Sequence, residues 1–208
     1  MAKLLYIESS PRKERSTSIR VASAFLSAYR TANPADSVET LDLWSTPLPE
    51  FDGDVLNAKY KILHGQEHTL AERDAWQAVV SLFARFNCAD KYLFSLPMWN
   101  FGVPYKLKHF IDLIVQPGLA FSFDDDTGYT GLVTGKPAAV VYSRGGSYEG
   151  DAAGAFDFQK TYFETFLNFI GVTDIRQVVV EPTLDRPEKV ESTVNAAVDK
   201  AKELAGAF

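Results

Sequence analysis

The chain between residues 92 and 104 reads Tyr92-Leu93-Phe94-Ser95-Leu96-Pro97-Met98-Trp99-Asn100-Phe101-Gly102-Val103-Pro104. It begins with an apolar run that predicts a buried strand ending at Ser95, and Pro104 suits the first turn of an amphipathic helix expected over residues 105–116. A connector that only turns the chain is usually polar and small. This one exposes Met98, Trp99 and Phe101, which predicts either a cover for a flat apolar group or simple packing on the core.

The apolar pattern on either side of this stretch predicts five strands that alternate with helices. Strands are expected at residues 3–7, 37–43, 90–95, 137–142 and 174–181, and helices at 18–29, 69–86, 105–116, 155–170 and 187–204. Residues 44–66 are expected to be a long connector and residues 118–135 a small hairpin. Because the central strands are apolar on both faces, we expect a single α/β domain over residues 1–208, an open doubly wound parallel sheet between helices.

Three loops of unusual composition, at residues 9–18, 95–104 and 143–148, each follow one of the expected strands. In open α/β sheets ligands bind outside the carboxyl ends of the strands, where the strand order reverses. The three loops should therefore meet at one edge of the sheet and outline one binding site.

The first of these loops places hydroxyl groups just before a helix, on Ser10, Ser16, Thr17 and Ser18. Free backbone N–H groups and the helix dipole attract an anion there, and hydroxyls add donors, so a phosphate is the natural occupant. Read alone, Ser16 or Ser18 is better explained as a simple helix cap. The loop also carries a basic cluster, Arg12, Lys13 and Arg15, which favours a phosphate without requiring one.

The third loop contains two consecutive glycines, Gly145 and Gly146, where backbone can approach a ligand closely and donate N–H groups. A plain turn is the alternative for this pair. No phosphate-binding P-loop fits the sequence, and the GxGxxG pattern is absent after the first strand, so one phosphate is expected rather than a pyrophosphate. A phosphate clamp, an aromatic loop and a donor-rich glycine loop together match flavin mononucleotide (FMN).

Composition argues against several classes of protein. The net charge of −6 over 208 residues argues against nucleic acid as a main partner. No apolar run approaches the length of a membrane span, and the N-terminus enters a strand directly, so neither a membrane segment nor a signal peptide is expected. Cys88 is the only cysteine in the sequence, which makes a disulfide within the chain impossible and favours a reducing cytoplasm.

Other candidate sites are weaker. Residues 64–68 read His64-Gly65-Gln66-Glu67-His68, which matches a zinc signature, but that motif needs both histidines on one helix face and Gly65 interrupts the helix. No metal site is therefore expected. We expect His109 to be partly exposed rather than catalytic, Cys88 to be a small buried residue, and residues 124–126 to form a solvated turn.

The chain resembles the FMN-dependent NAD(P)H azoreductases, a branch of the flavodoxin-like quinone reductases, over essentially its whole length. The resemblance rests on Ser9-Ser10 with Ser16-Thr17-Ser18, on Pro97-Met98-Trp99-Asn100-Phe101, and on Gly131-Leu132-Val133-Thr134-Gly135-Lys136 leading to Ser143-Arg144-Gly145-Gly146. The basic residues between Arg12 and Arg15 are a departure, because members often have smaller, neutral residues there.

The resemblance implies a role for each motif. Ser10, Ser16, Thr17 and Ser18 would hold the FMN phosphate; Pro97, Met98, Trp99, Asn100 and Phe101 would border its isoalloxazine ring; Ser143, Arg144, Gly145 and Gly146 would contact the polar edge of that ring. It also implies strand order 2-1-3-4-5 and a homodimer with the FMN sites at its interface. Phe121, Phe123 and Tyr129 would line the partner's site, and Trp99 and Phe101 would shape the acceptor slot.

The expected activity is ping-pong hydride transfer from NADH or NADPH, through FMN, to quinones or aromatic azo compounds. The cofactor carries this chemistry, and no side chain is expected to act as a general acid. The competing hypothesis is a flavodoxin-like FMN electron carrier without nicotinamide-dependent activity. A third possibility, an α/β binding or signalling module without flavin, is disfavoured because Ser9 and Ser10 stand where a receiver-type domain needs acidic residues.

Overall fold

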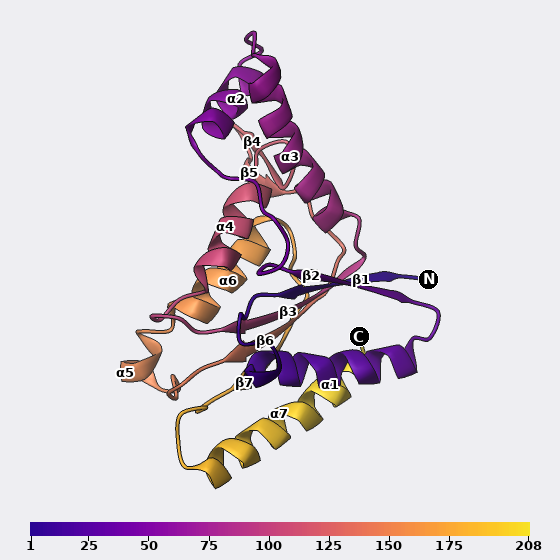
Figure 1. Ribbon diagram of the computed structural model, residues 1–208, viewed down its shortest axis with the longest axis vertical. Coiled ribbons are helices and arrows are strands. Elements are labelled where there is room, and N and C mark those ends of the chain that lie inside the picture. Colours follow the sequence, from indigo (N-terminus) through magenta and orange to yellow (C-terminus); the bar gives the residue numbers. More distant parts are fainter.

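Five parallel strands form the central sheet of the computed structural model, which describes residues 1–208 with all side chains but that of residue 151 (Figure 1). The strands are β1 (Lys3–Glu8), β2 (Ser37–Asp42), β3 (Lys91–Pro97), β6 (Ala138–Ser143) and β7 (Ile175–Val180). They lie in the order β2-β1-β3-β6-β7, which confirms the expected order 2-1-3-4-5. Because every neighbouring pair is parallel, the carboxyl ends of β1, β3 and β6 lie at one edge, and the order reverses between β1 and β3.

Helices cover both faces of the sheet. One face carries α1 (Thr17–Ala32) and α7 (Pro187–Gly206); the other carries α3 (Leu70–Asn87), α4 (Tyr105–Ile114) and α6 (Phe158–Phe169) (Figure 1). Alternate residues of a strand point to opposite faces. Leu4 and Tyr6 of β1 accordingly join the apolar cluster beneath α1 and α7, while Leu5 and Ile7 join the cluster on the other face.

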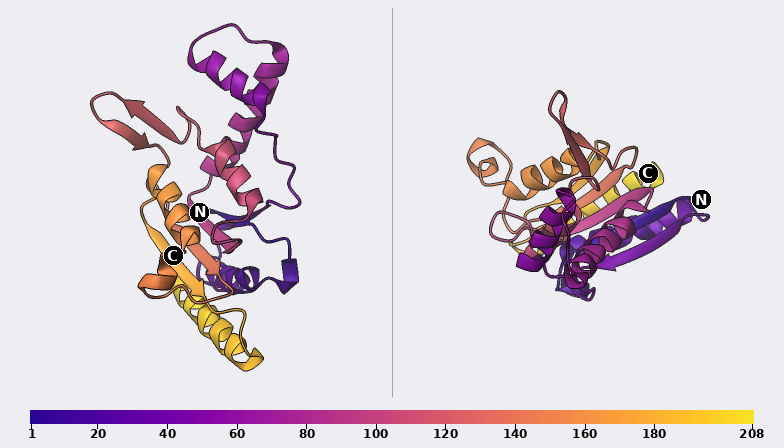
Figure 2. Two further views of the ribbon diagram at one scale, coloured as in Figure 1. Left: turned by 90° about the vertical axis from the view of Figure 1, so that its left-hand side faces the viewer. Right: turned by 90° about the horizontal axis from the view of Figure 1, so that it is seen from above.

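The expected hairpin is present as β4 (Phe121–Asp124) paired with β5 (Gly128–Gly131). In its turn, one carboxylate oxygen of Asp124 accepts hydrogen bonds from the amides of Asp126 and Thr127, at 3.0 and 3.1 Å. These bonds lower the pKa of Asp124, as expected for a solvated turn. The hairpin projects from the body of the molecule, on the side opposite α1 and α7 (Figure 2).

Three helical segments were not expected. The connector over residues 44–66 contains α2 (Gly53–Leu63), and short turns form η1 (Lys13–Arg15) and α5 (Asp151–Gly154). Asp52 caps α2 by accepting hydrogen bonds from Asp54 and Val55, but the buried face of the helix is short, so its apolar periodicity is weak. The expectation for Cys88 was also wrong, because the residue ends α3 at the surface and is exposed.

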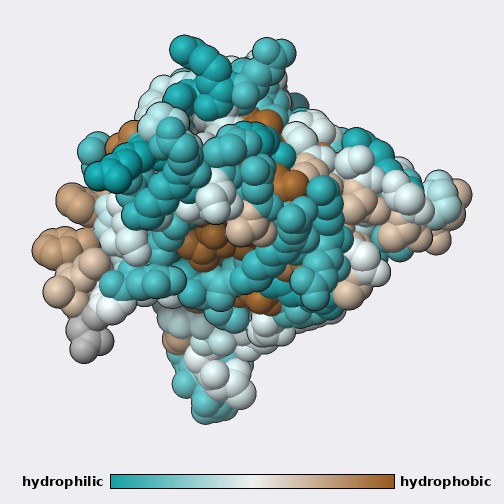
Figure 3. All heavy atoms as spheres, turned by 90° about the horizontal axis from the view of Figure 1, so that it is seen from below, coloured by the Kyte–Doolittle hydropathy of each residue, from teal (hydrophilic) through white to brown (hydrophobic). Residues whose placement is uncertain are grey.

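The surface over α1 and α7 is mostly hydrophilic, and apolar side chains gather at the margin where α5 lies (Figure 3). Phe156 and Phe158, which follow α5, are both exposed. Within the described part of the chain, no helix combines the length and the apolar character needed to cross a membrane.

Candidate active site

A cavity of about 210 Å³ opens at the carboxyl edge of the sheet. It is lined by residues that follow four strands: Ser10, Arg12, Ser16, Thr17, Pro97, Met98, Trp99, Ser143, Gly145, Thr183 and Leu184. The three loops singled out in the sequence thus meet in space. The fourth loop, after β7, was missed, although it follows a strand and the same rule places it at this edge.

The hydroxyl side of the cavity lies at the start of α1. Ser10, Ser16 and Ser18 are buried, and the Ser16 and Ser18 hydroxyls lie 3.1 Å apart. No side chain that the structure describes accepts a hydrogen bond from the first turn of α1, so neither serine acts as the simple cap that the sequence left open. The N–H groups of this turn are therefore left for another acceptor, and the hydroxyls of Ser16 and Thr17 line the same space.

One cation of this loop, Lys13, forms ion pairs with two carboxylates behind the cavity. The Lys13 ammonium lies 2.6 Å from Glu8 and 2.5 Å from Asp42, at the ends of β1 and β2. Burial alone would lower the pKa of Lys13, but the two carboxylates raise it above its ordinary value. The ion pairs tie the loop to the sheet edge and hold Lys13 in a left-handed conformation (φ 49°) that is uncommon outside glycine.

The aromatic loop closes on itself in a tight turn. The amide of Trp99 donates to the carbonyl of Gly102 and the amide of Gly102 donates back, both at 3.0 Å. The two central residues, Asn100 and Phe101, have φ angles of 46° and 69°. Such turns favour Asn-Gly, and a phenylalanine at the second position is strained. Glycine would adopt this backbone conformation with less strain than phenylalanine does. The presence of a large ring at this position therefore favours a functional role for Phe101.

An unpredicted residue, Trp44, braces this loop. Its indole Nε1–H donates to the carbonyl of Ser9 at 2.9 Å, and its ring lies 5.9 Å from the ring of Trp99 and 5.4 Å from that of Tyr105, centroid to centroid. Ser9 is itself fixed, because its hydroxyl donates to the Ser95 carbonyl at 2.7 Å. The hydroxyl loop and the aromatic loop are therefore joined through one side chain. The position of this tryptophan, just after edge strand β2, is the sequence feature from which its role could have been predicted.

The glycine loop is held by the loop that follows β7. Thr183 donates its hydroxyl to the carbonyl of Arg144 at 2.8 Å, and the amide of Leu184 donates to the carbonyl of Gly145 at 3.0 Å. A Cβ added to Gly145 would lie only 2.8 Å from the Leu184 side chain, whereas one on Gly146 would meet nothing of the chain nearer than 3.9 Å. A side chain at Gly145 would therefore have to displace the exposed Leu184 side chain, whereas Gly146 leaves its side of the loop open.

Arg144 does not line the cavity, because its guanidinium turns into the protein. It is 3% exposed and lies 2.7 Å from Asp157 and 3.2 Å from Glu181, while its Nε donates to Gln159 at 3.1 Å. Gln159 in turn donates to the carbonyl of Leu96 at 3.1 Å. This network connects the ends of β3, β6 and β7 to the start of α6, so the Arg144 side chain supports the site from behind.

A second, more open hollow of about 800 Å³ adjoins the other side of Trp99. Asn100, Val103 and Tyr105 line it from the aromatic loop and α4, together with Phe51 and His109. His109 is half-buried, as expected, and its Nε2–H donates to the carbonyl of Pro49 at 2.9 Å. Trp99 is therefore a wall shared by a polar cavity and a broad, partly apolar hollow, an arrangement suited to two ligands side by side.

Several predicted site residues lie outside the 210 Å³ cavity. Ser18 is buried behind Ser16, Gly146 lies beside Tyr148, and Phe101 projects outward with its ring 5.7 Å from that of Phe156. The hairpin residues Phe121, Phe123 and Tyr129 line neither hollow; their rings pack on one another, and Phe121 and Tyr129 also pack on Phe169.

The zinc-like motif falls in the turn between α2 and α3. His64 ends α2, Gly65 has a left-handed φ of 62°, and α3 begins only at Leu70, so the two histidines do not share a helix face. Among the side chains that the structure describes, no group of three potential ligands could hold a metal ion.

The strand order and the edge cavity define a protein of the flavodoxin-like class, and the comparisons agree. A family model described as "Flavodoxin-like fold" matches residues 2–205, and the chain belongs to this family. An "FMN-dependent NADH:quinone oxidoreductase" of Desulfotalea psychrophila is 54% identical over 208 residues, covering 98% of each chain.

Solved structures point the same way. A crystal structure of an azoreductase from Bacillus anthracis matches with a TM-score of 0.92 and 31% identity over the whole of both chains. An FMN-dependent NADH-azoreductase from the same species, solved in complex with FMN, matches with a TM-score of 0.87 and 29% identity, covering 99% of this chain and 100% of the other.

Proposed function

We propose that this chain is an FMN-dependent NADH:quinone oxidoreductase that also reduces aromatic azo compounds. The observation that carries the proposal is the cavity at the carboxyl edge, where hydroxyls at the start of α1, the aromatic loop and the glycine loop meet. Relatives that span the whole chain carry the same activity in their names.

The donor set of the cavity fits FMN. Ser10, Ser16 and Thr17, with the uncapped first turn of α1, offer hydroxyl and N–H donors to a phosphate. Pro97, Met98, Trp99, Asn100 and Phe101 would border the ring system, and Ser143, Gly145 and Gly146 would face its polar edge with hydroxyl and backbone donors. The open side of Gly146 leaves room for a planar group to approach the backbone.

Bound FMN would take up a hydride from NADH and pass two electrons to the acceptor. The residues of the chain position the partners and shape the electrostatics. Backbone N–H groups around Asn100, Gly145 and Gly146 would supply donors for negative charge at the ring edge. The hollow beside Trp99 would take NADH and acceptor in turn, with Trp99 and Phe101 excluding water from the flat ligand. A shared hollow predicts a ping-pong cycle.

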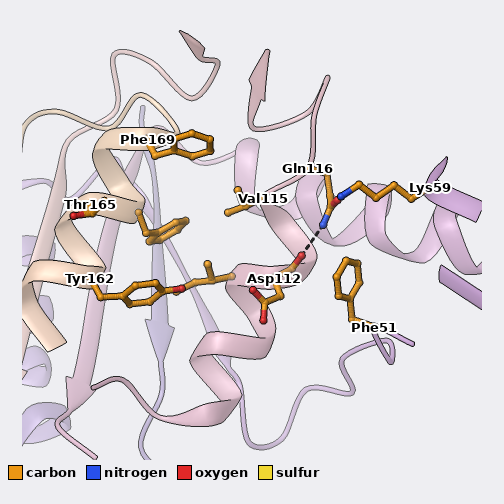
Figure 4. A pocket seen from close by; sticks show the side chains of 10 residues that line it. Phe51, Lys59, Asp112, Val115, Gln116, Tyr162, Thr165 and Phe169 are labelled. Carbon is orange, nitrogen blue, oxygen red and sulfur yellow. Dashed lines mark hydrogen bonds between the residues drawn. The ribbon is translucent and has the colours of Figure 1, made fainter. Parts of the chain in front are cut away.

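We further propose that the working unit is a homodimer. An apolar groove of about 370 Å³ runs beside α4 and α6, where Tyr162, Thr165 and Phe169 face Val115 and Asp112, with Phe51 and Lys59 on the opposite side (Figure 4). The groove adjoins the hairpin, because Phe169 also packs against Phe121 and Tyr129.

Phe123 and Tyr129 are 57% and 65% exposed, and in a homodimer they would be free to line the partner's FMN site. Large exposed aromatics next to an apolar groove are typical of protein interfaces. A single monomeric species in sedimentation at micromolar concentration would contradict the dimer. The free, exposed Cys88 is compatible with the cytoplasm as the expected compartment.

The test is steady-state kinetics of the FMN-loaded protein. We expect NADH oxidation that depends on added quinone, and double-reciprocal plots against NADH at several quinone concentrations that give parallel lines. Protein that retains FMN but oxidises no NADH would support the electron carrier instead. Protein that retains no FMN would overturn the proposal.

A further inference from the structure

The cavity at the sheet edge carries a single formal charge. Of the described residues that line it, only Arg12 is charged; the others offer hydroxyls, backbone groups or apolar surface. In a cleft with neutral walls, one unpaired guanidinium sets the sign of the local potential and favours an anionic group. The one formal charge among the lining residues is therefore positive, and it lies at the hydroxyl-loop end of the cavity.

Arg12 is also unpaired. Among the described residues it makes no ion pair and its guanidinium makes no hydrogen bond, whereas the neighbouring Lys13 lies within 2.6 Å of both Glu8 and Asp42. The third cation of the loop, Arg15, is exposed and does not line the cavity. Of three cations in four residues, Lys13 thus fixes the loop, while Arg12 and Arg15 are both exposed and only Arg12 lines the cavity.

The loop backbone fixes where Arg12 stands. The amide of Arg15 donates to the Arg12 carbonyl at 3.0 Å and the amide of Ser16 donates to the Lys13 carbonyl at 2.8 Å, which builds the turn η1 directly onto the start of α1. Arg12 therefore lines the cavity beside the same hydroxyls, those of Ser10, Ser16 and Thr17, that precede the uncapped helix.

We propose that the Arg12 guanidinium binds the phosphate of FMN and makes the site prefer FMN over riboflavin. This inference rests on the proposed function. Arginine stays charged at all accessible pH values and matches phosphate oxygens with two parallel donors, while hydroxyls and backbone N–H groups alone leave a dianion uncompensated. A cation at this position would give tighter and more salt-sensitive retention of the cofactor than the hydroxyls and N–H groups alone.

The experiment titrates the apoprotein with FMN and, separately, with riboflavin, followed by quenching of flavin fluorescence at two salt concentrations. For Arg12→Gln we expect the Kd for FMN to rise about tenfold and the Kd for riboflavin to stay unchanged. Arg12→Lys should recover part of the loss, since it keeps the charge. The salt dependence of FMN binding should be weaker in Arg12→Gln than in the wild type.

Arg15→Gln is the matched control, because it removes a cation three residues away that does not line the cavity; both Kd values should stay at the wild-type level. Equal weakening of FMN and riboflavin by Arg12→Gln would indicate a merely structural role and overturn the inference, as would an unchanged Kd for FMN. Wild-type protein that binds riboflavin as tightly as FMN would overturn it while leaving a flavin site. Binding of neither flavin would overturn the proposed function and this inference together.

Discussion

Single residues decide how closely a planar ligand can approach the cavity. In the aromatic loop, Phe101 is kept in a left-handed conformation that glycine would adopt more easily, so the turn retains a ring at a cost in stability. In the glycine loop, by contrast, no side chain fills the space beside the backbone, because the position that a Cβ of Gly146 would occupy is open. A flat ring bound between the two loops, as proposed above, would account for both features.

Gly146→Val tests the open side of the glycine loop. A Cβ there meets no atom of the chain nearer than 3.9 Å, and the backbone does not require glycine, so the apoprotein should keep its free energy of unfolding within about 0.5 kcal/mol. The Kd for FMN should rise at least about tenfold, or ~1.4 kcal/mol, because the side chain occupies the approach path. Gly53→Val, with open space around its Cβ at the start of α2, is the control. An unchanged Kd for Gly146→Val would count against the glycine-loop assignment.

At the scale of elements, the network around Arg144 connects three strand ends to α6. Arg144→Met would leave Asp157 and Glu181 as partly buried carboxylates without their cation, and breaking a buried pair costs about 3–5 kcal/mol, so a loss toward the lower end of that range is expected. Urea unfolding of the apoprotein measures this loss. The control, Arg73→Met, removes an exposed pair with Asp74 and should change stability by less than about 0.5 kcal/mol. A loss below about 1 kcal/mol for Arg144→Met would show that the network is not structural.

The ion pairs behind the hydroxyl loop predict a pH dependence of stability. Burial alone would raise the pKa of Asp42, but hydrogen bonds from Lys13 and the Trp44 amide bring it below its ordinary value of 3.8. A carboxyl whose folded-state pKa is lowered contributes stability above its unfolded pKa, and that stability is lost as the pH falls through the folded pKa.

We therefore expect Asp42→Asn to be less stable than the wild type by about 1 kcal/mol at neutral pH. Thermal unfolding as a function of pH should show the gap closing below about pH 4. A gap that stayed constant from pH 7 down to pH 3 would refute a contribution from the charge of Asp42.

The elements also show what sequence alone could predict. The five strands followed from apolar runs, their order followed from the resemblance to the flavodoxin-like reductases, and the meeting of the loops at one edge followed from the parallel topology. Helix α2 was not predicted because its buried face is short. The role of Trp44 was not predicted because its partners, Trp99 and Tyr105, are distant in sequence. The inward turn of Arg144 depends on Asp157 and Glu181, which only the folded chain brings within reach.

At the scale of the whole molecule, the sheet edge, the hollow beside Trp99 and the exposed hairpin fit the proposed homodimer. The cavity would hold FMN, the adjoining hollow would take NADH and then the acceptor, and a second copy would bring its hairpin to the open side. Each part is incomplete alone: the 210 Å³ cavity is small for a whole cofactor, and the 800 Å³ hollow is open to solvent.

The central claim is that FMN bound to this chain exchanges hydride equivalents with NADH and a quinone. An anaerobic titration of the FMN-loaded protein with NADH, followed by flavin absorbance, tests it most directly. We predict that one equivalent of NADH per bound flavin bleaches the absorbance, and that one equivalent of quinone restores it. Flavin absorbance that persists with excess NADH would contradict the account.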